Sequence, residues 1–190
     1  GIDAAIVQDV GLMSVLRREL PELELHASTQ MNVRGKRGIE LAARLGCSRV
    51  TLARELSIEK VAELAELGVD LEVFVHGALC ICQSGQCLLS SLIGGRSANR
   101  GLCAQPCRLP YRFVDADGRK LADEGQYLLS PRDLCGIEMI DRLIEADVAS
   151  LKIEGRMKSP EYVSTVTAIY REAIDRAWED VASYEVEPDA

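Results

Sequence analysis

The chain has 190 residues, of which 47% are hydrophobic and only 4% aromatic, and its formal net charge is −8 at pH 7. This composition supports a folded domain with an aliphatic core and excludes a disordered chain, while the acidic charge argues against nonspecific binding to nucleic acid. The sequence contains no run of 18 apolar residues and no secretion signal, so we expect a cytoplasmic protein without a membrane partner.

Strand-like and helical segments alternate along the chain. Short aliphatic runs with β-branched residues predict strands, and stretches with apolar residues every three to four positions predict helices. Ser57, and Ser159 followed by Pro160, stand where helix caps and first turns are expected. The predicted strands cover residues 4–9, 23–30, 48–55, 70–77 and 147–156, and the predicted helices cover residues 10–20, 38–46, 57–68 and 159–180.

The spacing of these segments predicts an α/β fold with a parallel sheet. Successive strands lie about 20 to 25 residues apart, close to the minimum for a unit of one strand and one helix. A (β/α)8 barrel of TIM type and a doubly wound sheet both fit, but no GxGxxG loop follows a strand, and the strands end on polar residues. We therefore expect the C-terminal portion of a TIM-type barrel from a longer protein. Its unpaired sheet edges would favour dimerisation or aggregation.

The regular spacing is interrupted before the last strand. Within the interruption, the Asp-Gly pair in residues 115–118 predicts the turn of a hairpin that spans residues 111–130. The segment of residues 131–146 predicts the start of a helix, with Cys135 near its first turn. We divide the chain into βα units of a partial barrel (residues 1–79), a cysteine-rich insertion (80–146), the last strand and helix (147–180) and a tail (181–190).

Six of the seven cysteines fall in the insertion, and Cys47 alone lies elsewhere, at a position typical of a small buried hydrophobe. An odd number of cysteines without a secretion signal favours metal or redox chemistry over disulfides. The chain has no CxxC knuckle for structural zinc, whereas an iron-sulfur cluster accepts four thiolates at looser spacings. Zinc, a nucleophilic thiol and plain buried thiols stay open as alternatives. The candidate cluster ligands are Cys80, Cys87, Cys135 and either Cys103 or Cys107.

The insertion is also the basic part of this acidic chain. No Asp or Glu occurs from Val73 to Val114, while four arginines, including Arg96 and Arg100, lie in this stretch. Such arginines can bind a phosphate backbone or an anionic substrate, or they can offset thiolate charge and pair with nearby carboxylates. Both interpretations stay open.

The stretch EVFVHGALCICQSGQCLLS, residues 72–90, resembles the signature of peptidase family U32, the collagenase-like proteases. It matches each fixed position of the pattern E-x-F-x-x-G-[SA]-aliphatic-C-x4-G-x-C-x-aliphatic-S. The resemblance continues through LHASTQMNV, ANRGLCAQPCR, LLSPRDLC and SLKIEGRMKSPEYV. It implies a TIM-type barrel with a cysteine-bearing insertion.

The same resemblance implies two kinds of activity. The family is named for collagenase-like endopeptidases, but other members resemble proteins that hydroxylate a tRNA wobble uridine or a ribosomal RNA cytidine without oxygen. For those members the resemblance implies a four-iron four-sulfur cluster and a small anionic co-substrate such as prephenate. The ligands that it implies here are Cys80, Cys87, Cys107 and Cys135, with Cys103 as the alternative to Cys107 and Cys82 as a spare.

The polar residues at the strand ends bear on this choice. A protease needs an activated water or nucleophile, and neither histidine stands in a protease motif, although His76 with Glu154 could act as a base. Oxygen-free hydroxylation of RNA calls for a redox cluster and an anion-binding face, so we prefer it to an endopeptidase with a peptide substrate and to a structural or scaffold role. The candidate catalytic residues are His26, His76 and Glu154, and the candidate substrate-binding residues are Arg54, Lys152, Arg156, Arg96 and Arg100.

Several of these residues also have a structural interpretation. His26 could be a buried histidine whose hydrogen bonds are satisfied within the fold. Lys152, Glu154 and Arg156 alternate along one strand and therefore face one side of the sheet. They could form an internal layer of salt bridges or a clamp for a substrate carboxylate.

Overall fold

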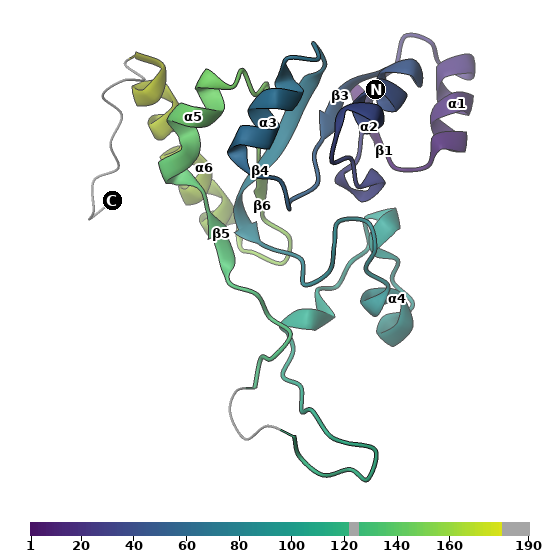
Figure 1. The fold of residues 1–190 in the computed structure, drawn as a ribbon, viewed down its shortest axis with the longest axis vertical. Helices are drawn as coiled ribbons and strands as arrows, with labels where there is room; N and C mark the ends of the chain where they lie inside the picture. Colours follow the sequence, from purple (N-terminus) through teal and green to yellow (C-terminus); the bar gives the residue numbers. More distant parts are fainter. Residues whose placement is uncertain (122–125, 180–190) are drawn as a thin grey trace.

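The computed structural model describes residues 1–121 and 126–179 and has an α/β architecture (Figure 1). The predicted tail (181–190), residue 180 and residues 122–125 of the predicted hairpin lie outside the described residues. The strands are β1 (Ala4–Val7), β2 (Glu24–Ala27), β3 (Cys47–Thr51), β4 (Asp70–Ala78), β5 (Asp133–Cys135) and β6 (Ser150–Glu154). The α-helices are α1 (Val10–Glu19), α2 (Lys36–Arg44), α3 (Ile58–Ala65), α4 (Leu89–Gly94), α5 (Ile140–Glu145) and α6 (Pro160–Glu179). Short 3-10 helices cover Thr29–Met31, Ala98–Arg100, Pro106–Arg108 and Ile137–Met139.

The described strands form one sheet in which five strands run parallel in the order β1, β2, β3, β4 and β6. Each new strand is added on the same side of the previous one, without the reversal of strand order that marks a doubly wound sheet. The short strand β5 pairs antiparallel with the end of β4. The predicted α/β class is confirmed, while closure into a barrel stays a prediction.

One face of the sheet packs against helices and forms the core. Along β4 the buried residues alternate with partly exposed ones, as expected for a strand with two different faces. Leu71, Val73 and Val75 lie in the same hydrophobic cluster as Met13 of α1 and Ile140 of α5, together with residues of α2, α3 and α6. The other face of the sheet therefore carries the polar residues that are available for a site.

The helix starts follow the predicted capping chemistry. The Ser57 hydroxyl accepts a hydrogen bond from the amide of Lys60 (3.3 Å), and the Ser159 hydroxyl accepts one from Tyr162 (3.2 Å). The Asp9 carboxylate accepts a bond of 2.7 Å from the amide of Leu12 at the start of α1. These bonds satisfy amides that the first turn of a helix leaves unpaired, and they fix where each helix leaves the sheet edge.

The region after the hairpin differs from the prediction. The turn at residues 115–118 is present, since the amide of Gly118 donates to Asp115 and Val114 bridges Lys120. Cys135 lies near the start of the helical segment, as predicted, but residues 133–135 form the strand β5, which was not predicted. The end of β4 extends past its pairing with β3, and residues 133–135 pair with that free backbone before helical structure begins at Ile137.

None of the described helices is both long enough and apolar enough to cross a membrane.

Candidate functional site

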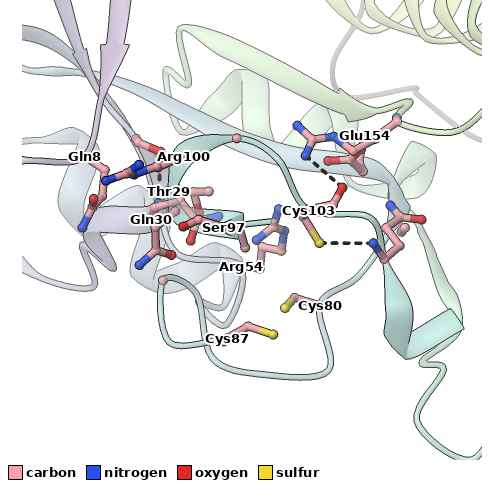
Figure 2. A pocket seen from close by; sticks show the side chains of 18 of the residues that line it. Gln8, Thr29, Gln30, Arg54, Cys80, Cys87, Ser97, Arg100, Cys103 and Glu154 are labelled. Atoms are coloured by element: carbon pink, nitrogen blue, oxygen red, sulfur yellow. Dashed lines mark hydrogen bonds between the residues drawn. The ribbon is translucent and has the colours of Figure 1, made fainter. Parts of the chain in front are cut away.

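A pocket of about 850 Å³ lies where the parallel strands end. Its size falls in the range of ordinary ligand sites, which is about 300 to 1,000 Å³. Residues that follow β1, β2 and β3 form one side, β4 and β6 supply Phe74, Lys152 and Glu154, and the segment from Ala78 to Arg108 closes the rest. Figure 2 shows side chains from these separate segments pointing into the same space. The pocket is thus a meeting point of the sheet edge and the cysteine-rich segment.

Four of the candidate thiols line this pocket: Cys80, Cys87, Cys103 and Cys107. Figure 2 shows Cys80, Cys87 and Cys103 on different parts of the chain around the guanidinium of Arg54. Both Cys103 and Cys107 line the pocket, so the choice between them as a cluster ligand stays open. Cys135 does not line it and lies exposed on β5.

The thiols influence each other electrostatically. Burial is the main cause that raises the pKa of Cys80, Cys82 and Cys107, and negative charge on neighbouring thiols raises each of them further. Arg54 opposes the shift at Cys80, and Arg108 opposes it at Cys107. The raised pKa values favour neutral thiols, and their ionisation would need additional positive charge, which a bound metal group would supply.

The donor set can be compared with two kinds of metal group. Within residues 1–121 and 126–179, no three His, Cys, Asp or Glu side chains are close enough to hold one metal ion. An iron-sulfur cluster takes four thiolates on separate irons, so its ligands lie farther apart than the ligands of a single ion. The number and chemistry of the pocket thiols fit such a cluster. Cys47 is buried with its sulfur 3.8 Å from that of Met13, as predicted for a small core residue.

Arg54 is a partly buried cation in the pocket lining. Its guanidinium carbon lies 4.0 Å from the centre of the Phe74 ring, a cation–π arrangement. Burial lowers the pKa of Arg54, and negative charge on Cys80 and Glu154 acts in the opposite direction. Its Nε has no hydrogen-bond partner within the described part of the chain. A guanidinium with a buried, unpaired donor is suited to bind an anion.

Lys152 lies in the pocket wall but already has a partner. Its Nζ is 2.6 Å from the Glu72 carboxylate, which also accepts bonds of 2.9 Å from Thr51 and from Ser150. Burial by itself raises the pKa of Glu72, but the bond and charge of Lys152 and the two hydroxyl bonds outweigh it and lower the pKa. Lys152 is therefore engaged in an internal ion pair, as its structural interpretation expects, whereas a layer that includes Glu154 and Arg156 stays a prediction.

The remaining predicted cations and Glu154 lie at different places. Arg156 and Glu154 line the pocket, where the Glu154 carboxylate accepts a bond of 2.8 Å from the Arg156 amide. The Arg156 guanidinium donates to the carbonyl of Cys103 (3.3 Å). Arg100 also lines the pocket, whereas Arg96 is exposed outside it and donates to the carbonyl of Leu102.

His76 faces away from the pocket because β4 contains one extra residue. Phe74 pairs with Lys152, but His76 pairs with Ile153, so the register shifts by one residue between them. This bulge turns His76 toward α6, where its ring nitrogens lie 3.3 Å and 2.9 Å from the hydroxyls of Tyr170 and Tyr162. Burial lowers its pKa. The structure thus does not bring His76 to Glu154, and its catalytic role stays a prediction.

His26 also lies outside the pocket lining. Its Nε2 is 2.9 Å from a carboxylate oxygen of Glu24, two residues earlier on the same strand, and this bond lowers the pKa of Glu24. The side chain is 13% exposed. This arrangement corresponds to the structural interpretation of His26, although no observation tests a catalytic role.

Two residues that hold the site together were not singled out from the sequence. Arg108 donates hydrogen bonds to Leu79, Ser130 and Pro131 and forms an ion pair of 3.2 Å with Asp133, so it ties the chain that follows β4 to the segment that leads into β5. Ser84 is only 1% exposed, although Gln83 beside it is exposed. The absence of acidic residues around Arg108 could have indicated that its partner lies elsewhere in the chain, whereas nothing in the sequence marks Ser84.

Comparison with known proteins places these features in a family. The model of peptidase family U32 matches residues 1–190. A 23S rRNA 5-hydroxycytidine C2501 synthase from Escherichia coli (strain K12) is 42% identical over 181 residues, which cover 95% of this chain and 27% of that protein. A tRNA hydroxylation protein P1 from Bacillus subtilis (strain 168) is 38% identical over 188 residues, which cover 96% of this chain and 44% of that protein.

A third relative has a name of a different kind. A collagenase from Porphyromonas gingivalis (strain ATCC BAA-308 / W83) is 41% identical over 187 residues, which cover 92% of this chain and 44% of that protein. The chain therefore spans less than half the length of these relatives. No solved structure matches it.

Proposed function

This chain belongs to peptidase family U32, and on that premise we propose that it is part of an enzyme that hydroxylates RNA without oxygen. The proposed substrate is a tRNA wobble uridine or a ribosomal RNA base, as the names of the rRNA and tRNA relatives suggest. A small anion such as prephenate would be the co-substrate. We also propose that the protein works in the cytoplasm, where such RNA is found.

The observation that carries the proposal is the convergence of thiols and cations in one pocket. Cys80, Cys87, Cys103 and Cys107 line it together with Arg54, Arg100 and Arg156, while the two histidines lie outside. A four-iron four-sulfur cluster would be held by four thiolates. Cys80 and Cys87 would supply two of them, and Cys107 or Cys103 the third. Cys135 would supply the fourth, or else whichever of Cys103 and Cys107 is not the third ligand. When bound, it would supply one-electron redox chemistry. Arg54 would hold an anion beside it.

The proposed architecture of the whole enzyme is a TIM-type barrel. The sequential parallel order of the strands supports this proposal, because strands of such a barrel are neighbours in chain order. The pocket at the carboxyl edge of the strands also supports it, since barrel enzymes build their sites there. Further strands between β1 and β6 would close the barrel and complete the pocket.

The second candidate function is a collagenase-like endopeptidase, which the name of the Porphyromonas gingivalis relative favours. For this reaction the pocket offers the Glu154 carboxylate as a base, with cations nearby to stabilise an oxyanion. A scaffold role is the third candidate. We prefer RNA hydroxylation because four thiols in a pocket have no evident use in peptide hydrolysis.

The cluster is tested by purifying the protein without oxygen and measuring its iron, sulfide and visible absorbance. We expect a brown protein with a broad absorbance band at about 400 nm, as is typical of iron-sulfur clusters. Cys87→Ala should remove the colour, and Cys82→Ala, the matched control, should retain it. Colourless protein that binds one zinc would contradict the cluster.

The reaction is tested in cells that lack the gene. We expect one hydroxylated nucleoside to disappear from digested tRNA or rRNA in a mass spectrum and to return with the wild-type gene but not with Arg54→Met. An unchanged nucleoside profile, together with cleavage of gelatin by the purified protein, would establish the endopeptidase instead.

A further inference from the structure

The loop that carries Cys80 and Cys87 is attached to the sheet edge by one buried residue, Ser84. Its neighbours Gln83 and Gln86 are exposed, and their backbones form a turn closed by a bond of 3.0 Å. Ser84 itself is 1% exposed. A hydroxyl buried in a surface loop must have hydrogen-bond partners, because leaving it unpaired would destabilise the fold.

Both polar groups of Ser84 bond to consecutive residues after β3. Its amide donates to the Glu55 carboxylate over 2.7 Å, and its hydroxyl accepts from the amide of Arg54 over 3.2 Å. The other oxygen of Glu55 lies 3.2 Å from the guanidinium of Arg34, which in turn donates to Asn32. A carboxylate that accepts an amide is a strong hydrogen-bond acceptor, so Glu55 fixes the loop firmly.

The next residue explains why the loop can approach so closely. Gly85 has φ of +76°, and a Cβ there would overlap the carbonyl oxygen of Gln30, in the 3-10 helix that follows β2. Only glycine combines this conformation with this approach at no steric cost. The loop is therefore held against two strand ends at once, midway between its two pocket thiols.

We propose that Glu55 and Ser84 form a latch that positions the loop of residues 80–87 and Arg54 relative to each other. Neither residue lines the pocket, so both are positioning residues: they act through the thiols and the guanidinium. The consequence for a cluster rests on the proposed function, whereas the latch itself does not. Opening the latch would free Cys80 and Cys87 from the sheet edge and release the backbone of Arg54.

The latch is tested first by hydrogen exchange in the protein freed of metal. Glu55→Ala should speed exchange of the peptide that covers residues 80–88 by about tenfold, because the Ser84 amide loses its acceptor. Ser84→Ala should have a smaller effect, and Glu55→Gln, which keeps an acceptor oxygen, should restore most of the protection. Glu63→Ala is the matched control, since Glu63 forms an exposed ion pair with Lys60 on α3.

Exchange of the β4 peptide, residues 70–78, separates a local latch from general stability. It should be unchanged in all four variants. Unchanged exchange of the loop in Glu55→Ala, or equally faster exchange of both peptides, would overturn the proposal.

The positioning role is tested in the protein purified without oxygen. Glu55→Ala should lose iron to a chelator about tenfold faster than wild type and should change the electron paramagnetic resonance spectrum, as residues that orient metal ligands do. Glu55→Gln should lie close to wild type. An identical spectrum and rate of iron loss in Glu55→Ala would overturn positioning even if the loop exchanges faster. If wild-type protein binds no iron, the proposed function fails, and the exchange experiment still decides whether the latch exists.

Discussion

The side chain of Lys152 shows how a predicted substrate ligand can already be engaged. Its ammonium neutralises Glu72, whose side chain is only 13% exposed and cannot easily exchange its partner for water. A lysine in this position contributes to the field of the pocket and at the same time stabilises the sheet. Arg54, which has a free buried donor, is the better candidate for binding an anion.

We predict that Lys152→Met lowers the free energy of unfolding by about 2 kcal/mol at pH 7, because Glu72 loses its counter-charge. The pKa of Glu72 lies below its ordinary value of 4.5 in the folded protein. Its stabilising effect is therefore present above pH 4.5 and lost as the pH falls through the folded pKa. Urea denaturation should show the difference between variant and wild type shrinking in acid. Lys60→Met, which removes an exposed ion pair, should lower the free energy of unfolding much less.

His76 gives a pH dependence of its own. Burial lowers its pKa from 6.5, so the neutral ring is favoured in the folded protein. The unfolded chain takes up the proton first as the pH falls, and stability is fully present above pH 6.5 and lost below it. We predict that His76→Gln reduces the slope of stability against pH between about pH 5 and 7, measured by urea denaturation. In Tyr162→Phe, which keeps the buried ring, the slope should persist.

The sequence predicted some of these residues better than others. Lys152, Glu154 and Arg156 could be placed on one side because alternation along a strand needs only a regular backbone. The side of the sheet on which His76 lies could not be predicted, because a single extra residue in β4 turns the side chains that follow it to the opposite face. The partners of Ser84 and Arg108 lie about 30 residues away in sequence (Glu55 and Leu79, for example) and depend on the packing of the loop.

At the scale of elements, β4 and β6 approach each other closely at Gly77. Its φ is +97°, and a Cβ there would overlap the carbonyl oxygen of Glu154. We predict that Gly77→Ala lowers the free energy of unfolding by about 2 to 4 kcal/mol, since both the conformation and the contact are unfavourable for alanine. Gly94→Ala, where a Cβ meets nothing within 4 Å, is the control. A loss in Gly77→Ala no larger than in Gly94→Ala would contradict this account.

The elements themselves were largely predictable, with β5 as an informative exception. Periodicity and caps indicated β1 to β4, β6 and the helices α1, α2, α3, α5 and α6, because those segments have a strong pattern of their own, whereas the short helix α4 was not predicted. Residues 133–135 have no such pattern, and they form β5 only because the end of β4 offers free backbone groups. Pairing of this kind is a tertiary effect that local sequence does not encode.

At the scale of the whole molecule, β1 forms an edge of the sheet with exposed apolar side chains. Ile6 is 58% exposed, and Val10 and Leu12 beside it are also exposed. We predict that this chain, expressed alone, associates through that edge, and that Ile6→Lys lowers its mass in light scattering. The control is Leu92→Lys, which is 80% exposed and lies on α4, outside the sheet. Equal effects of both changes would point to unspecific association.

The fold class followed from the regular alternation of segments, and the family followed from the signature of residues 72–90. Closure of the sheet into a barrel stays a prediction, because no pairing among the described strands joins β1 to β6. The thiols of the pocket could be predicted from the sequence, but the geometry of the site could not. The position of Cys135 depends on β5, and that of His76 depends on the bulge in β4.

The bulge in β4 also has a consequence for protein engineering. Because the extra residue Val75 lies between Phe74 and His76, these two positions, which a regular strand would place on one face, open onto different compartments of the molecule. An imidazole intended to act in the pocket should therefore be introduced at position 74. A variant that lacks Val75 would pair regularly with β6 and would leave His76 opposite Ile153, beside the tyrosines.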